Sequence, residues 1–162
     1  MTAHELSEDS TDLSGRVAVV TGADSVWSNR SEFHVGHFGA GNQLVVSNGG
    51  FVSAESGEIG SEVGSANNQV TVIGFGSKWS NTNILYVGNY GVGNRLVIAD
   101  GGAVDNANGY IGSNPSSSNN LAVVTGAGSL WTNRNEMYVG EGGSGNQLVI
   151  SNGARVIAGT AS

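Results

Sequence analysis

Short apolar runs alternate along the chain with polar, glycine-rich segments. Within two of these runs, Leu96 and Ile98, and likewise Val70 and Val72, lie two positions apart. A period of two places both members of each pair on the same face of a strand. Glycine-rich segments between such runs are typical of turns. The pattern therefore predicts many short strands, each with one buried face.

The runs belong to a 52-residue repeat that has no insertion or deletion. Three kinds of residue recur at this spacing: Trp27, Trp79 and Trp131; Asn42, Asn94 and Asn146; and Gly22, Gly74 and Gly126. Each repeat divides again into two similar coils, which we expect to hold about 23 and about 29 residues, as in a solenoid. The prediction is an all-β fold, a parallel β-helix (β-solenoid) with about six coils, two per 52-residue repeat.

The predicted solenoid covers residues 16–162, in repeats 16–67, 68–119 and 120–162. The polar, acidic segment 1–15 precedes it, and we interpret this segment as a cap. Bare solenoid ends expose unpaired strand edges, which proteins normally cover. Because no such cap follows the last repeat, we expect an edge there that can pair with another chain.

The recurring asparagines and glycines mark turns. Asn42 and its repeat mates precede a strand by two residues, where stacked asparagines can form a hydrogen-bonded ladder; the alternative is a row of solvent-facing turn residues. The pairs Gly49-Gly50 and Gly101-Gly102, and likewise Gly153, follow a strand and an Asn or Asp. We expect these glycines to adopt positive φ, which glycine does without steric cost.

The tryptophans have two interpretations. A row of them could form an exposed aromatic strip that binds sugars. Valines hold the matching positions of the other coil, namely Val52, Val104 and Val156. A large apolar side chain that alternates with valine favours packing in the core or at a corner.

Composition and charge exclude several classes of function. The chain has 162 residues, 27 of them glycine, and no cysteine, which excludes a disulfide scaffold and a thiolate metal site. The formal net charge of -7 argues against a nucleic-acid partner, because phosphate binding depends on Lys and Arg. No apolar stretch approaches the roughly 20 residues of a membrane-spanning helix, and the N-terminal residues do not resemble a signal peptide.

Few residues suggest chemistry. Residues 15–23 resemble the first strand and turn of short-chain dehydrogenases, but they lack the further glycines that admit a pyrophosphate, and residues 121–127 repeat the same pattern. His34 and His37 could form a metal pair, although surface variation explains them better. We expect no catalytic residue, no metal site and no cofactor.

A cluster of three glutamates is the remaining candidate for a cation site, because hard cations prefer oxygen ligands. It comprises Glu55, Glu58 and Glu62, and it does not recur in the other repeats. Asp100 and Asp105 lie across a glycine turn, and Asp24 is remote from them, so no pair of carboxylates is spaced for glycoside hydrolysis.

The motifs as a whole resemble the repeats of bacterial autotransporter passengers and PEP-CTERM-type surface proteins. The motifs that carry this resemblance are Gly74–Asn81, Leu85–Gly88, Gly91–Ile98 and Ile111–Gly112, and they recur in Gly126–Asn133 and Gly145–Ile150. The resemblance implies a non-catalytic, secreted or surface-displayed solenoid with a structural or adhesive role. Alternatives are a subunit that stacks end to end with copies of itself and a carbohydrate-binding β-helix, so the expected partners are the chain itself or surface glycans.

Overall fold

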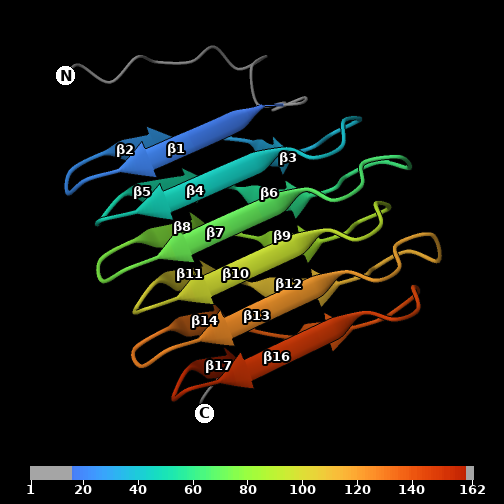
Figure 1. The fold of residues 1–162 in the computed structure, drawn as a ribbon. Coiled ribbons are helices and arrows are strands. Elements are labelled where there is room, and N and C mark those ends of the chain that lie inside the picture. Colours follow the sequence, from blue (N-terminus) through green and yellow to red (C-terminus); the bar gives the residue numbers. More distant parts are fainter. Residues whose placement is uncertain (1–15, 160–162) are drawn as a thin grey trace.

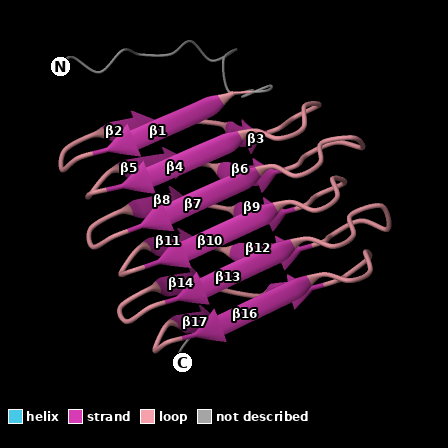
Figure 2. Ribbon diagram, viewed as in Figure 1, coloured by secondary structure: helices cyan, strands magenta, loops and turns pink. Residues whose placement is uncertain are grey.

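The chain forms a stack of coils in which every regular element is a strand. The computed structural model describes residues 16–159, which contain 17 strands and no helix (Figure 2). Among these residues there is accordingly no helix long and apolar enough to cross a membrane. All strand pairs are parallel and form three sheets that run along the stack (Figure 1). The predicted all-β parallel solenoid is confirmed.

Each coil contributes one strand to each sheet. The first sheet contains, in order, β1 (Val17–Thr21), β4 (Gln43–Ser47), β7 (Gln69–Ile73), β10 (Arg95–Ala99), β13 (Leu121–Thr125) and β16 (Gln147–Ser151). The second contains β2 (Val26–Ser28), β5 (Phe51–Ala54), β8 (Lys78–Asn81), β11 (Ala103–Asn106), β14 (Leu130–Asn133) and β17 (Arg155–Ala158). The third contains β3 (Glu32–Val35), β6 (Ser56–Ile59), β9 (Ile84–Val87), β12 (Asn108–Ile111) and β15 (Met137–Val139). The described residues therefore make five complete coils and two strands of a sixth.

The expected division of each repeat into a shorter and a longer coil holds for the register steps of the third sheet but not for those of the first sheet, which are constant. Thr21 and Ser47 are register partners with a separation of 26 residues, and the same step recurs in every pair of that sheet. In the third sheet the steps are unequal, because the step from Glu32 to Ser56 is shorter than the step from Gly57 to Leu85. The corner loops between strands alternate in length from one coil to the next, and this alternation causes the difference. Within each coil a longer loop at one corner is offset by a shorter loop at another, so every coil has the same total length.

The inward-facing side chains of the alternating runs are buried, as their pattern predicts. Leu96, Ile98, Val70 and Val72 are completely buried. Full burial of such a side chain contributes about 1.5–3 kcal/mol relative to its exposure.

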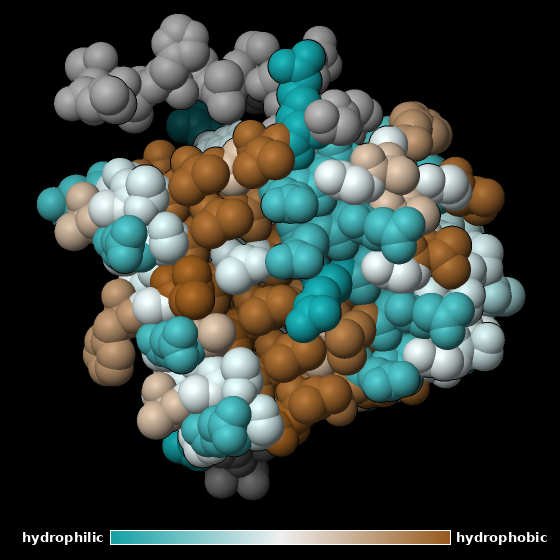
Figure 3. Space-filling view, viewed as in Figure 1, coloured by the Kyte–Doolittle hydropathy of each residue, from teal (hydrophilic) through white to brown (hydrophobic). Residues whose placement is uncertain are grey.

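The outer face of the first sheet carries an apolar column along its centre, which is less usual for a face turned to solvent. Its central column consists of register partners, one from each coil, and they are Val19, Val45, Thr71, Val97, Val123 and Val149. Figure 3 shows this face as a hydrophobic band that crosses the strands.

The turns after the first-sheet strands confirm part of the glycine prediction. Gly49, Gly101 and Gly153 have φ of 84°, 87° and 76°, as expected, but Gly50 and Gly102 do not have positive φ. Glycine is needed at these second positions for lack of space, since a Cβ on Gly50 would lie 2.5 Å from the carbonyl oxygen of Val20.

A ladder of buried asparagines runs along the stack at the entrance to the first sheet. Its members are Asn42, Asn68, Asn94, Asn120 and Asn146. In each step a backbone N–H donates to the Oδ1 of the asparagine one coil later, at 2.8–2.9 Å. The first four are completely buried, so the ladder interpretation is confirmed and the solvent-facing alternative is wrong. Asn68 and Asn120 also recur at the spacing of the sequence repeat, and they belong to the other coil of each repeat, one coil away from Asn42, Asn94 and Asn146.

The sequence predicts a cap at the N-terminal end of the stack and a pairing edge at the C-terminal end. The predicted cap, residues 1–15, lies outside the described residues. At the other end, β16, β17 and β15 are the outermost strands of their sheets. That this edge pairs with a second copy stays a prediction.

Replacing Asn94 by alanine tests the ladder. Asn94→Ala removes the acceptor for the backbone and side-chain amides of Asn68. We expect a loss of about 2–4 kcal/mol in the free energy of unfolding, because each buried group left without a partner costs about 1–3 kcal/mol. Urea denaturation followed by tryptophan fluorescence measures it. Asn83→Ala, at an exposed corner, is the control, and an equal loss in both variants would contradict the ladder's role.

Candidate functional site

The tryptophans lie on the second sheet and point into the stack. Trp79 and Trp131 are completely buried, and Trp27, in the first coil, is partly buried. Trp79 pairs with Val52 and Trp131 with Val104, so tryptophan and valine alternate along one column as the sequence predicts. The core interpretation is confirmed for Trp79 and Trp131, and the exposed sugar-binding strip of tryptophans is wrong.

Glycines in the third sheet explain why tryptophan occurs only in every second coil. A Cβ on Gly57 would lie 2.4 Å from Cζ2 of Trp79, and one on Gly109 would lie 3.3 Å from Cζ2 of Trp131. Each indole therefore extends over a glycine of the preceding coil. Sequence reasoning missed this pairing, although Gly57 and Gly109 hold equivalent positions in successive repeats.

The polar ends of the two buried indoles differ. Trp131 Nε1 donates to Oδ1 of Asn106 at 2.8 Å, and Nδ2 of Asn106 donates to Oδ1 of Asn133 at 2.6 Å. In the earlier repeat, Ala54 holds the position of Asn106. Trp79 Nε1 and both polar side-chain atoms of Asn81 have no hydrogen-bond partner among the described residues.

A second candidate is the outer face of the third sheet. Its central column has one residue from each coil, and the register partners are His34, Glu58, Tyr86, Tyr110 and Tyr138. The column therefore joins an acid–base pair in the first two coils to three tyrosines in the next three.

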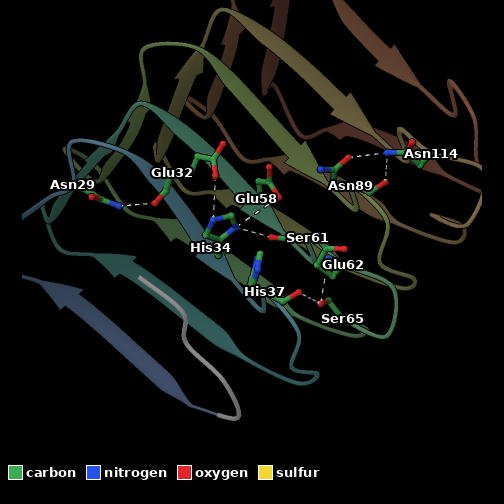
Figure 4. Close-up of polar contacts among 10 residues, drawn as sticks. All are labelled: Asn29, Glu32, His34, His37, Glu58, Ser61, Glu62, Ser65, Asn89 and Asn114. Carbon is green, nitrogen blue, oxygen red and sulfur yellow. Dashed lines mark hydrogen bonds and ion pairs between the residues drawn. The ribbon is translucent and has the colours of Figure 1, made fainter. Parts of the chain in front are cut away.

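His34 is the centre of the polar end. Its Nδ1 lies 2.7 Å from Oγ of Ser61 and 3.6 Å from Oε2 of Glu58, and its Nε2 lies 3.5 Å from Oε2 of Glu32 (Figure 4). The side chains of His34 and Glu58 are only 12% and 11% exposed. Burial acts to raise the pKa of Glu58, but hydrogen bonds from His34 and Ser61, together with the charge of His34, lower it overall.

Within residues 16–159, the contact between Ser61 and His34 resembles part of a nucleophilic site, since a histidine can activate a serine hydroxyl. Ser61 is only 2% exposed, however, so a substrate does not reach its oxygen. The contact instead joins β3 to the loop that follows β6. We interpret the His34, Glu58 and Ser61 cluster as a polar link between the first two coils.

The candidate cation and metal ligands do not converge. The His34 and His37 rings lie 4.6 Å apart, and Glu58 faces His34, whereas Glu55 is exposed at a corner. Within residues 16–159, no group of three His, Asp or Glu side chains is placed to hold a metal ion. The dehydrogenase-like stretch forms β1, which lies in the same sheet and register as β13, as the repeat indicates.

Comparison of the chain with protein-family models, with curated proteins and with solved structures gave no match. Inference about function therefore depends on the geometry and on the sequence motifs.

Ala54→Asn should supply the partner that Trp79 and Asn81 lack. By analogy with Asn106, the new amide would accept from Trp79 Nε1 and donate to Asn81. We expect the free energy of unfolding to rise by about 1–3 kcal/mol, at about 0.5–1.5 kcal/mol per hydrogen bond. Thermal and urea unfolding measure the change.

Asn106→Ala is the matched control and should lower the stability by a similar amount. A loss of stability in Ala54→Asn would contradict the expectation. It would indicate that the Phe33 ring, centred 6.2 Å from the Trp79 ring, already fills the space.

The polar link predicts a dependence of stability on pH. Because the pKa of Glu58 is lowered on folding, its carboxylate stabilises the fold above its unfolded-state pKa, and this contribution is lost as the pH falls through the folded value. Glu58→Gln should therefore lose less stability than the wild type on acidification. His34→Gln removes the charged partner and should move the Glu58 titration to higher pH, measured by NMR. An unchanged titration would contradict the link.

Proposed function

We propose that the chain is a non-catalytic structural module of a surface-displayed protein, in which it acts as a rigid spacer. The observation that carries the proposal is the unbroken register of the first sheet, where six strands follow one another at one constant step. Such an array can be lengthened or shortened by whole repeats without a change in its cross-section.

The packing and hydrogen bonding of the interior support a structural role. The core residues fill the stack, and the buried asparagines bond chiefly to one another and to the backbone between coils. The hydrogen bonds of these asparagines thus connect each coil to its neighbours. The resemblance of the repeat motifs to those of autotransporter passengers and PEP-CTERM-type proteins supports a location at the cell surface.

Deleting one repeat tests the proposed modularity. Removal of residues 68–119 places Asn120 directly in the position of Asn68 and takes out two coils. We expect a folded chain shorter by roughly 10 Å, at about 4.8 Å per coil. Its unfolding midpoint should be lower, because fewer interfaces remain. Small-angle X-ray scattering and circular dichroism measure both properties.

Removal of residues 68–123 is the control, since this slightly longer deletion also removes Asn120 and the first half of β13 and should prevent folding. If the in-register deletion also failed to fold, the chain would act as one indivisible domain, and the spacer proposal would be overturned.

A further inference from the structure

Three tyrosines form a stack on the outer face of the third sheet. Tyr86, Tyr110 and Tyr138 come from β9, β12 and β15, which are adjacent strands. The ring centroids of Tyr86 and Tyr110 are 5.1 Å apart with an interplanar angle of 26°, and those of Tyr110 and Tyr138 are 5.0 Å apart with an angle of 12°. All three side chains are partly exposed. The stack thus presents aligned phenol rings that solvent reaches.

The backbone holds these rings in place before any reaction. Tyr110 is paired in parallel register with both neighbours, so its ring has one partner on each side. When two reacting groups are held side by side, the entropy cost of bringing them together is already met, and their effective concentration greatly exceeds that of groups on separate molecules.

We propose that the tyrosine stack is an oxidative cross-linking site, at which a peroxide-driven reaction joins neighbouring rings as dityrosine and so links adjacent coils covalently. Each of two phenols loses one electron and one proton to give a tyrosyl radical. The radicals form a carbon–carbon bond between the positions ortho to their hydroxyls, and the rings regain aromaticity by moving the two ortho hydrogens to the oxygens. Hydrogen peroxide takes up the two electrons and two protons and becomes two molecules of water.

A carboxylate lies where the phenolic proton must go. The hydroxyl of Tyr138 donates to Oε2 of Glu136 at 2.8 Å. This hydrogen bond is the main cause that raises the pKa of Tyr138. Once the ring has lost an electron, Glu136 is placed to accept the proton.

Several competing oxidisable groups are buried or absent. Trp79 and Trp131 are completely buried, Trp27 and Met137 are partly buried, and the chain has no cysteine. A link between rings of adjacent coils would thus provide the covalent connection that a disulfide provides elsewhere. The fourth tyrosine, Tyr90, is 40% exposed but lies outside the stack, so it serves as an internal comparison.

The test treats the full chain, at micromolar concentration, with a haem peroxidase and limiting hydrogen peroxide. We expect dityrosine fluorescence, a monomer lighter by two hydrogen atoms, and a linked peptide that joins Tyr110 to Tyr138 or to Tyr86. The yield per chain should not change on dilution, because the reacting rings belong to one molecule. The linked monomer should also unfold at a higher temperature than the untreated chain.

Two phenylalanine variants provide the control. Tyr110→Phe keeps an aromatic ring in the stack but removes the reactive phenol from both pairs, so the intramolecular yield should fall about tenfold or more, given the advantage of held groups. Tyr90→Phe should keep the wild-type yield. Circular dichroism checks that both variants fold. An unchanged yield in Tyr110→Phe, or cross-linked dimers as the main product in dilute wild-type protein, would overturn the proposal.

Discussion

In a solenoid, each coil must end directly above its own starting position, one strand spacing further along the stack. The asparagine ladder is the interaction that fixes this alignment. Each Asn Oδ1 accepts the backbone N–H of the residue at the same position one coil earlier. The ladder leaves no room beside it: a Cβ on Gly60 would lie 2.1 Å from Nδ2 of Asn94, and one on Gly88 would lie 2.2 Å from Nδ2 of Asn120. A glycine at the end of the third strand and a buried asparagine before the first strand therefore form one unit, and the alignment of the three sheets follows from it.

The two coils of a repeat have the same length but pack differently: one has tryptophan in its second-sheet strand, and the other has valine at the matching position. The tryptophan coil has one more residue before its second-sheet strand, and its indole occupies the space over a glycine of the valine coil. This is the physical reason why the sequence repeats only with every second coil although the backbone repeats with every coil. The first repeat departs from the pattern, because Ala54 stands where the next repeat has Asn106 and Phe33 adds an aromatic ring beside Trp27.

The sequence was sufficient to predict what depends on position within one repeat. Strand alternation identified Leu96 and Ile98 as core residues, and the valine positions indicated that the tryptophans are not adjacent. Contacts between coils were harder to predict, because they depend on corner lengths. The step from His34 to Glu58 is shorter than one coil of the first sheet, and the step from Glu58 to Tyr86 is longer, so neither spacing matches the visible period. The polar link and the tyrosine stack therefore became apparent only in the structure.

The asparagine ladder also has a direction. In every step the earlier coil donates and the later coil accepts, from the Arg16 N–H to Oδ1 of Asn42 and onward to Asn146. A chain that emerges from the ribosome with its N-terminus first must consequently wait, at every stage, for the following coil before the buried amides of the present one are satisfied. Folding during synthesis would thus lag one coil behind the growing end, and a stalled chain would always present one incomplete turn. Aligned hydrogen bonds of this kind polarise one another, so completion of each turn favours the next.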